Sequence, residues 1–192
     1  MSYTRVWWKR VGAPEPVLTR DPEVLRRAEK VILPGVGAFD KGMRNLSDFG
    51  LLDALNEAAL DRRVPILGIC LGMQLLTTSS EEGERPGLGW IDARTVRFRF
   101  PTRSDLKVPH MGWNYVRAAR DNPLIPVGDR SRFYFVHAYY VVCTHHQDAI
   151  GTTTYGIEFA CAVNHANIFG VQFHPEKSHR FGTALLEAFV AL

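Results

Sequence analysis

The stretch Val64-Pro65-Ile66-Leu67-Gly68-Ile69-Cys70-Leu71-Gly72-Met73-Gln74-Leu75-Leu76 changes character at its centre. Its first half is a short apolar run typical of a buried strand, and a helix is expected from Met73. The junction, Gly68-Ile69-Cys70-Leu71-Gly72, has the pattern of a nucleophile elbow with cysteine in place of serine. Such a turn is strained and closely packed, so it requires small residues on both sides of the nucleophile. The pattern favours a nucleophilic Cys70; a structural cysteine between two packing glycines is the alternative.

Around this stretch, short apolar strands alternate with helices, which predicts a parallel sheet covered by helices on both faces. Helices are expected over residues 5–11, 21–29, 46–60 and 181–192, and further strands over 16–19 and 31–33.

The second half of the chain has the pattern of antiparallel strands. Residues 95–100 alternate strictly, with Arg97 and Arg99 on one face and apolar side chains on the other, which is typical of a half-exposed strand. Four more strands are expected, over residues 133–142, 150–155, 160–164 and 168–173. Because no linker or composition break divides the chain, we expect one domain over residues 1–192.

A base for Cys70 is found in Phe169-Gly170-Val171-Gln172-Phe173-His174-Pro175-Glu176. The apolar strand brings His174 to its carboxyl end, where the catalytic groups of open α/β sheets gather. Glu176, two positions further on, could accept a hydrogen bond from one imidazole nitrogen while the other faces Cys70. The alternative is a surface histidine and glutamate at the end of a strand.

A third strand ends at Leu33-Pro34-Gly35-Val36-Gly37. Its two glycines allow backbone amides to turn inward, as an oxyanion hole requires. The segment fits neither phosphate-binding glycine pattern, and an ordinary turn is the alternative.

Composition limits the classes of protein to which the chain can belong. Of its 192 residues, 46% are hydrophobic and 22% charged, proportions that exclude a disordered, collagen-like or coiled-coil chain. No apolar run is long enough to span a bilayer, and a net charge of +3 is too mild to indicate nucleic-acid binding. Three widely spaced cysteines and no signal peptide favour a reducing cytoplasm. The pair His145-His146 has no second ligand cluster, so we expect no metal.

The chain resembles the class I (triad) glutamine amidotransferases in three motifs that occur in the family's order. These motifs are Pro34-Gly35-Val36-Gly37, Gly68-Ile69-Cys70-Leu71-Gly72-Met73-Gln74 and Phe173-His174-Pro175-Glu176. The resemblance implies a three-layer, flavodoxin-like α/β fold with a mixed, mostly parallel sheet and an antiparallel C-terminal extension. It implies that Cys70 attacks the glutamine carboxamide and that His174, oriented by Glu176, transfers the proton.

Further residues take their expected roles from the same resemblance. The backbone N–H of Leu71 and one from the Val36–Gly37 loop would stabilise the oxyanion. Gln74 and the backbone of Ala138 and Tyr139 would line the glutamine pocket. No cofactor is implied.

Within the family, the chain is similar to the glutaminase subunits of imidazole glycerol phosphate synthase. The similarity lies in His110-Met111-Gly112-Trp113-Asn114, in Tyr134-Phe135-Val136-His137-Ala138-Tyr139 and in Lys177-Ser178. It implies a heterodimer with a (β/α)8-barrel cyclase subunit, which uses the ammonia to form imidazole glycerol phosphate and an aminoimidazole carboxamide ribotide in histidine biosynthesis. Met111, Trp113, Tyr134 and Lys177 match positions at that subunit interface.

The sequence departs from the family at its beginning. The family starts with an apolar strand followed by Asp-Tyr-Gly-x-Gly-Asn, which has no counterpart here. That strand lies inside the sheet in the flavodoxin-like order, so its absence is expected to leave two strand edges facing a gap and to weaken stability and cyclase binding. We expect a shortened copy rather than a rearranged sheet.

Two other functions stay open at this point. The chain could be a paralogous glutaminase that feeds another synthase, for example in surface-sugar amidation. It could also be a non-catalytic subunit that only binds a partner, which the presence of Cys70, His174 and Glu176 argues against.

Overall fold

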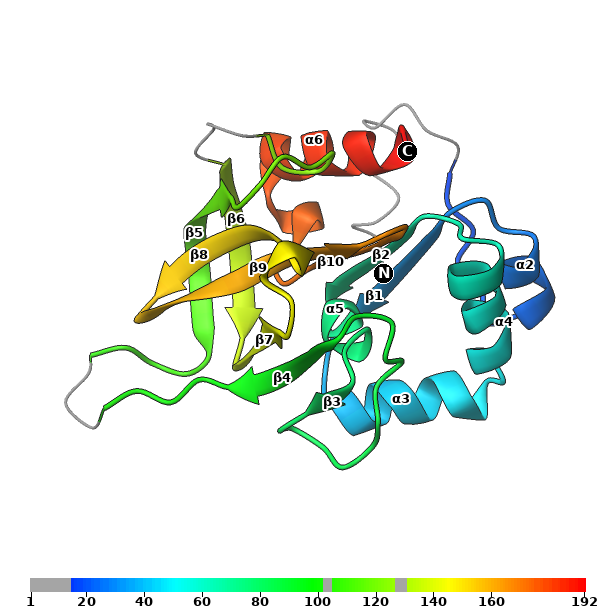
Figure 1. The fold of residues 1–192 in the computed structure, drawn as a ribbon, viewed down its shortest axis with the longest axis horizontal. Coiled ribbons are helices and arrows are strands. Elements are labelled where there is room, and N and C mark those ends of the chain that lie inside the picture. The colour runs from blue at the N-terminus through cyan, green and yellow to red at the C-terminus, as the bar shows by residue number, and fades with distance from the viewer. Residues whose placement is uncertain (1–14, 102–104, 127–130) are drawn as a thin grey trace.

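The computed structural model describes residues 15–101, 105–126 and 131–192 (Figure 1). Its helices are α2 (Pro22–Arg26), α3 (Phe39–Asp48), α4 (Leu52–Asn56), α5 (Leu71–Leu75) and α6 (His179–Val190), with a π-helical turn η1 (Glu57–Asp61) and 3-10 turns η2 (His146–Asp148) and η3 (Pro175–Lys177). Its strands are β1 (Val31–Gly35), β2 (Ile66–Cys70), β3 (Ser79–Ser80), β4 (Ala93–Arg97), β5 (His110–Ala118), β6 (Ser131–His137), β7 (Tyr139–Cys143), β8 (Ala149–Tyr155), β9 (Ile157–His165) and β10 (Ile168–Val171). The helix expected over residues 5–11 lies outside the described residues.

Three parallel strands form the centre of the fold. Strand β2 lies between β1 and β10, and Ile66 pairs with Val31 on one side and with Ile168 on the other. All five residues of β2 and all four of β10 are buried. A strand that is covered on both faces has no reason to alternate, which is why the sequence there reads as a continuous apolar run.

Helices cover both faces of these strands, as the sequence predicted. Ile66 packs into a core cluster with the apolar side chains of α3, α4 and α5. The next residue, Leu67, points to the opposite face and joins a second cluster that includes Leu185 and Phe189 of α6. Figure 1 shows α6 on one side of the sheet and α3 on the other. The three-layer α/β arrangement is therefore confirmed.

An antiparallel extension continues the sheet beyond β10. Strand β9 pairs antiparallel with β10, and β7, β8, β4 and β5 follow through further antiparallel pairs. The strand expected over 133–142 is divided at Ala138, because β6 pairs with β5 whereas β7 pairs with β4. The half-exposed strand expected over residues 95–100 is β4, with Arg97 exposed and Val96 buried, but it starts at Ala93 and ends at Arg97, so residues 98–100 lie outside it.

The prediction of one continuous helix over 46–60 was wrong. Helix α3 ends at Asp48, Gly50 takes a left-handed φ of 64°, and α4 starts at Leu52. A glycine in this conformation terminates a helix at little cost. The periodic apolar side chains that suggested one helix, such as Leu51 and Leu55, are still buried because both helices pack on the same face of the sheet.

The strand predicted over 16–19 was also wrong. These residues form no strand, and the side chains of Val17 and Leu18 are 74% and 84% exposed. Strand β1 stands at the end of the sheet, so its outer edge has no strand partner among the described residues. The gap expected between two strand edges is absent, because β1 pairs directly with β2 along its whole length, so the expectation of a shortened copy with an unfilled place in the sheet was wrong.

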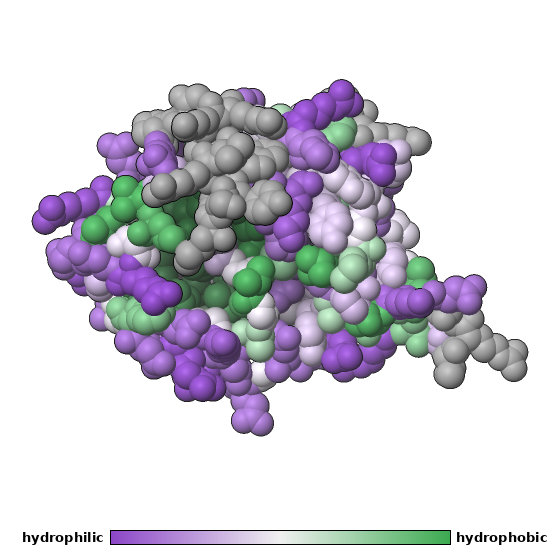
Figure 2. All heavy atoms as spheres, turned by 180° about the vertical axis from the view of Figure 1, so that it is seen from behind, coloured by the Kyte–Doolittle hydropathy of each residue, from purple (hydrophilic) through white to green (hydrophobic). Residues whose placement is uncertain are grey.

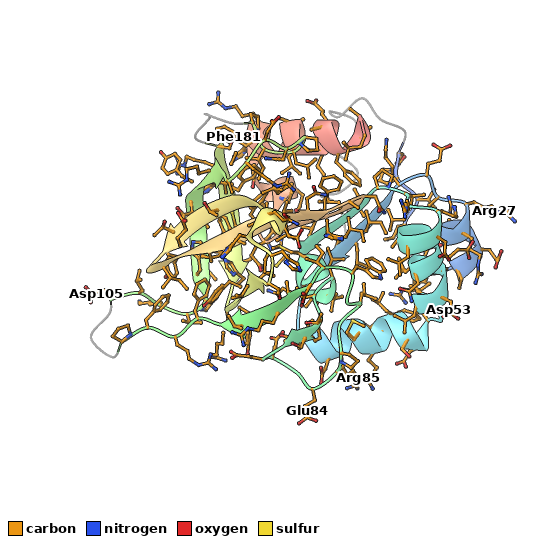
Figure 3. The ribbon with its side chains drawn as sticks, viewed as in Figure 1. Arg27, Asp53, Glu84, Arg85, Asp105 and Phe181 are labelled. Atoms are coloured by element: carbon orange, nitrogen blue, oxygen red, sulfur yellow. The ribbon has the colours of Figure 1, made fainter. Side chains whose placement is uncertain are left out.

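The surface is mixed in character. Figure 3 shows the side chains of Arg27, Asp53, Glu84, Arg85 and Asp105 at the periphery of the molecule. Figure 2 shows apolar residues gathered in a hollow on the face opposite to that of Figure 1. No helix in the described ranges is long and apolar enough to cross a membrane.

Candidate active site

Cys70 is the last residue of β2 and directly precedes α5. Its backbone is strained, with φ 55° and ψ −110°, in a region that a residue with a side chain rarely adopts. Its side chain is buried, and its thiol donates a hydrogen bond to the carbonyl oxygen of Val136 at 4.0 Å. This is the strained strand-to-helix turn that the sequence pattern predicted.

The structure has no room for a side chain at Gly68 or Gly72, the glycines that flank Cys70. A Cβ on Gly68 would lie 2.7 Å from the backbone carbonyl of Gly72, and a Cβ on Gly72 would lie 1.8 Å from the carbonyl oxygen of Leu33. Neither backbone neighbour can move aside without disrupting β1 or α5. The two glycines therefore let α5 pack against the strands closely enough to hold Cys70 at the corner.

His174 is held by strand β6 rather than by its own strand. Its N–H donates to the carbonyl oxygen of Tyr134 at 2.9 Å, in an isolated antiparallel bridge just beyond the end of β10. The buried hydroxyl of Ser178 donates to the carbonyl oxygen of His174 at 2.6 Å and accepts from the N–H of Tyr134 at 3.0 Å. Two backbone positions are thus joined through one side chain.

The imidazole of His174 lies between an acid and a thiol. Its Nδ1 atom is 2.8 Å from Oε1 of Glu176, and its buried Nε2 atom makes no hydrogen bond to the described residues. Burial by itself lowers the pKa of His174, but its interactions with Cys70 and Glu176 outweigh burial and raise that pKa to about 9. The structure therefore brings together the cysteine, histidine and glutamate that the sequence singled out, and an imidazolium at neutral pH suits proton donation.

Two buried glutamine side chains lie beside Cys70. Nε2 of Gln74 donates to Oε1 of Gln172 at 3.1 Å and lies 3.4 Å from the carbonyl oxygen of Tyr139. Nε2 of Gln172 lies 3.8 Å from Sγ of Cys70. Gln74 and Tyr139 were expected at the site, but Gln172 was not. Its place in the mostly apolar segment between β10 and His174 was the only signal in the sequence.

The expected oxyanion donors flank Cys70 in the structure. Gly35 is the register partner of Cys70, so the Val36–Gly37 loop leaves the sheet directly beside the cysteine. Gly37 has a φ of 106°, which only glycine adopts readily, and Val36 is exposed. Leu71 begins α5, and the first N–H groups of a helix have no partner within it.

Four expected interface residues share one surface of the β5–β6 pair and η3. Met111 and Trp113 are 62% and 40% exposed, and Trp113 contacts the ring of Tyr134 edge-on with centroids 6.2 Å apart. Nζ of Lys177 lies 5.6 Å from the centroid of the Tyr134 ring. Exposed aromatic side chains next to cations are typical of protein–protein interfaces.

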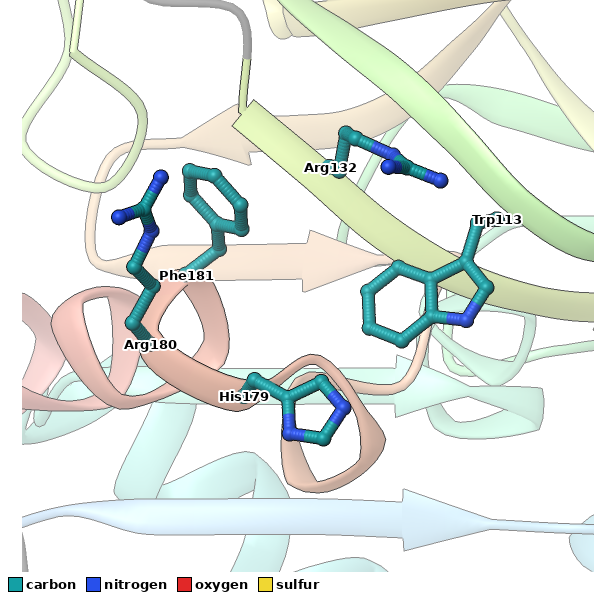
Figure 4. A pocket seen from close by; sticks show the side chains of 5 residues that line it. All are labelled: Trp113, Arg132, His179, Arg180 and Phe181. Atoms are coloured by element: carbon teal, nitrogen blue, oxygen red, sulfur yellow. The ribbon is translucent and has the colours of Figure 1, made fainter.

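A cavity of about 470 Å³ opens next to these residues (Figure 4). Trp113 stacks on His179 with an interplanar angle of 2°, and the guanidinium of Arg132 lies 5.7 Å from the Trp113 ring. Arg180 and Phe181 complete the lining. The cavity therefore combines flat apolar walls with two guanidinium groups.

The structure contains two further thiols and several further histidines. Burial raises the pKa of Cys143 to about 11 and raises that of the fully buried Cys161 further, as expected for core thiols. His145 and His146 are exposed. Within the described part of the chain, no three histidine, cysteine, aspartate or glutamate side chains are arranged to hold a metal ion.

The chain is similar to known proteins over nearly all of its length. The sequence model of the family described as Glutamine amidotransferase class-I matches residues 13–192. The "Imidazole glycerol phosphate synthase subunit HisH 2" of Methanococcus maripaludis is 52% identical over 177 residues, covering 92% of this chain and 87% of that protein. The protein of the same name from Pseudomonas aeruginosa is 50% identical over 185 residues, covering 96% of this chain and 90% of its own length.

Solved structures resemble the fold at low identity. The glutaminase domain of Trypanosoma brucei CTPS, solved with bound acivicin, aligns with a TM-score of 0.68 at 15% identity, covering 98% of this chain and 87% of that one. At this identity the likeness concerns the fold alone.

Proposed function

Since the chain belongs to the class I glutamine amidotransferase family, we propose that it is the glutaminase subunit of an imidazole glycerol phosphate synthase. It hydrolyses glutamine to glutamate and ammonia. The observation that carries this proposal is the geometry around His174, whose imidazole contacts Glu176 through Nδ1 and has its pKa raised by Cys70 and Glu176 against the effect of burial. The family match over residues 13–192 supports a single amidotransferase domain.

In the first half of the reaction, His174 takes the proton of the Cys70 thiol, and the resulting thiolate attacks the carboxamide carbon of glutamine to form a tetrahedral intermediate. When the C–N bond breaks, the imidazolium of His174 gives its proton to the leaving nitrogen, and ammonia and a thioester result. The raised pKa of His174 supports this role, because it keeps the imidazole protonated at neutral pH until the leaving group needs the proton.

In the second half, water attacks the thioester carbon while His174, now neutral, removes a proton from it. The C–S bond breaks, Cys70 is regenerated and glutamate leaves. Glu176 accepts a hydrogen bond from Nδ1 throughout, which fixes the ring orientation and stabilises its positive charge. Glutamine and water are thereby converted into glutamate and ammonia, with no other reactant.

The negative oxygen of each tetrahedral intermediate needs hydrogen-bond donors, and we assign these to the N–H of Leu71 and to one N–H of the Val36–Gly37 loop. The register pairing of Gly35 with Cys70 supports this assignment, since it starts the loop beside the nucleophile. Gln74 and the backbone of Ala138 and Tyr139 form the wall of the glutamine pocket in this proposal. Loss of one such donor typically costs about 3 kcal/mol of transition-state stabilisation.

The ammonia passes to a partner, which we propose is a (β/α)8-barrel cyclase in the cytoplasm. The named relatives are subunits of a synthase, which supports a partner subunit. The exposed group of Met111, Trp113, Tyr134 and Lys177 supplies an aromatic and cationic docking surface. One of its members, Tyr134, lies on β6, the strand that holds His174.

A second candidate function keeps the chemistry and changes the acceptor of ammonia. Cys70, His174 and Glu176 account for the release of ammonia but not for its acceptor, so a paralogous glutaminase that serves another synthase is this second candidate. A role as a purely binding subunit is disfavoured by the arrangement of Cys70, His174 and Glu176.

The proposal is tested by glutamate release in the presence and absence of a purified cyclase subunit. The intact chain should release glutamate when the cyclase is present and should be alkylated at Cys70 by a glutamine-derived diazoketone. Cys70→Ala should do neither. If the cyclase has no effect but the diazoketone labels Cys70, the second candidate function is supported; if neither glutamate nor label is found, the glutaminase proposal is wrong.

A further inference from the structure

A buried histidine pair, absent from the proposed mechanism, lies behind the active site. Nδ1 of His110 in β5 is 3.0 Å from Nε2 of His137 in β6, and the two residues are register partners. Both side chains are at least 95% buried, at 3% and 5% exposure. The ring of His110 stacks between Phe135 and Tyr155, with centroids 4.8 and 4.1 Å apart. The pair is therefore held rigidly inside an aromatic cluster.

The inner end of this pair contacts the wall of the active site. Nδ1 of His137 lies 2.7 Å from the carbonyl oxygen of Tyr139. Because a carbonyl oxygen can only accept, Nδ1 must carry the proton, and Nε2 of His137 is left as an acceptor. His110 must then donate from Nδ1, which leaves its own Nε2 as an acceptor.

The hydrogen bonds of Asn114, at the outer end of the pair, lead independently to the same assignment of protons. The side-chain nitrogen of Asn114 donates to the carbonyl oxygen of Thr154 at 2.9 Å, and its oxygen accepts from the N–H of Tyr115 at 2.8 Å. These bonds fix the orientation of the Asn114 amide. The same nitrogen lies 3.4 Å from Nε2 of His110, so that Nε2 accepts. Both ends thus require neutral imidazoles with Nδ1 protonated.

The carbonyl oxygen of Tyr139 also fixes two amides on the other side. It faces Nε2 of Gln74, which makes the nitrogen rather than the oxygen of that amide point toward β7. The same nitrogen donates to Oε1 of Gln172, so the amide of Gln172 must turn its own nitrogen toward Cys70. One backbone oxygen therefore determines that an N–H, and not an oxygen, faces the sulfur.

We propose that Gln172 is a positioning residue that donates a hydrogen bond to the Cys70 thiolate, and that the His110–His137 pair keeps its amide in the donating orientation through Tyr139 and Gln74. An amide oxygen in the same place would repel the thiolate, whereas an N–H stabilises it. This inference rests on the proposed role of Cys70 as nucleophile and adds how that nucleophile is activated.

Neutrality of the pair is a requirement of this arrangement. A second proton on Nε2 of His137 would face the Nδ1–H of His110 across their 3.0 Å contact, and one on Nε2 of His110 would face the side-chain nitrogen of Asn114. Burial lowers the pKa of His110 to about 4 and is also the main reason that the pKa of His137 falls to about 3, so both rings are neutral at physiological pH. The charged groups that face the pair from neighbouring elements agree with this, since His174 also lowers the pKa of His137.

The experiment measures the rate at which iodoacetamide alkylates Cys70 in the intact chain as a function of pH, with mass spectrometry to separate Cys70 from Cys143 and Cys161. Gln172→Met retains the size of the side chain and removes the donor. We expect it to slow alkylation at neutral pH about tenfold and to move the midpoint of the pH–rate profile upward. Gln147→Met, an exposed glutamine with no place in the chain of hydrogen bonds, is the control and should change nothing.

Two variants of His137 test the relay itself. In His137→Asn the amide nitrogen can replace Nδ1 and still donate to Tyr139, whereas in His137→Gln the amide reaches the Nε2 position and this donor is lost. We expect alkylation within about twofold of the unchanged chain for Asn and a loss of about threefold for Gln. The double variant with Gln172→Met should be no slower than Gln172→Met alone, because both act through one amide.

Three results would overturn the inference. These are equal losses for His137→Asn and His137→Gln, additive losses in the double variant, or an unchanged pH–rate profile in Gln172→Met. If Gln172→Met does not fold, the two His137 variants decide alone. Alkylation measures the reactivity of the Cys70 thiol, whereas glutamate release measures the complete reaction. A chain that releases no glutamate but shows the expected changes in alkylation rate would refute the proposed function and still support the hydrogen-bond relay from His110 and His137 to Gln172.

Discussion

Gly72 lies directly on the carbonyl oxygen of Leu33, so that a Cβ on Gly72 would come within 1.8 Å of it. This contact joins the first turn of α5 to β1, the strand that leads into the Val36–Gly37 loop. The position of the nucleophile and the position of the loop beside it therefore depend on a single close approach of two backbones.

Gly72→Ala is expected to destabilise the fold by about 3 kcal/mol or more, because a backbone oxygen in a central strand pair cannot move away from the new methyl group. Thermal denaturation measures the change. Gly50→Ala is the matched control: no atom lies within 4 Å of its Cβ position, so only its φ of 64° is unfavourable, at a cost of about 1 kcal/mol. Equal melting temperatures for the two variants would contradict this account.

Cys70→Ala and Cys70→Gly should both lose glutamate release by several orders of magnitude, since either removes the nucleophile. Their stabilities should differ. At φ 55° a glycine is unstrained and an alanine is not, so Cys70→Gly should be more stable than Cys70→Ala by about 1 kcal/mol. Calorimetry on the two inactive chains checks this, and a more stable Cys70→Ala would argue against strain at this corner.

Glu176→Gln should lower the rate of glutamine hydrolysis at least about a hundredfold, because Nδ1 of His174 loses its charged partner. It should also change the pH profile. The contact with Glu176 helps to raise the pKa of His174 to about 9, so without it the alkaline fall in activity should begin at lower pH. Rates measured from pH 6 to 10 check both effects. Glu158→Gln removes an exposed glutamate paired with Arg117 and should leave the profile unchanged.

Acid should destabilise the fold through the buried histidine pair. The pKa values of His110 and His137 fall to about 4 and about 3 on folding, from an ordinary value near 6.5. The unfolded chain therefore binds protons that the folded chain excludes, and stability declines as the pH falls from about 6.5 to about 3. His174 has the opposite sign: its raised pKa stabilises the fold below about pH 6.5, and this contribution is lost as the pH rises through about 9.

Melting temperatures from pH 4 to 8 test the acid effect. His110→Asn retains a donor toward His137 but cannot be protonated, so its melting temperature should depend less steeply on pH below 6.5. His146→Asn, which changes an exposed histidine, should follow the unchanged chain. Parallel curves for all three chains would show that the pair does not carry the acid sensitivity.

Trp113→Ala should weaken cyclase binding by about 2 kcal/mol, roughly thirtyfold in the dissociation constant, because a half-exposed tryptophan at the centre of an aromatic and cationic surface is a typical hot spot. Titration calorimetry with the purified cyclase gives the constant. Leu60→Ala removes a 52% exposed apolar side chain from η1 and should bind normally. The turn η1 continues α4, which Figure 1 shows at the end of the molecule opposite β5 and β6.

Local sequence patterns predicted the elements that depend on local physics. The continuous apolar runs of β2 and β10 and the glycines around Cys70 define strands and a turn whatever lies beside them. The break between α3 and α4 could have been read from Gly50, whose left-handed conformation ends a helix, but the apolar period continued across it. Residues 16–19 are apolar enough for a strand, yet a strand needs a neighbour, which the described residues do not provide.

The part of the site that the sequence did not predict depends on long-range register. Gln172 matters because β10 pairs with β2 and so brings its side chain near Cys70, 102 positions away in the chain. His110 and His137 matter because β5 and β6 align them opposite each other. Cys70, His174 and Glu176 were found because each stands in a motif that is recognisable on its own.

The shared hydroxyl of Ser178 has a mechanical consequence. It bonds the carbonyl oxygen of His174 and the N–H of Tyr134, so the imidazole proposed as the general base is fixed to β6, which also carries an aromatic residue of the proposed interface. A displacement of β6 along its axis would therefore displace the imidazole of His174 as well. In the proposed heterodimer, a partner that shifts Tyr134 would therefore shift the imidazole of His174 with it.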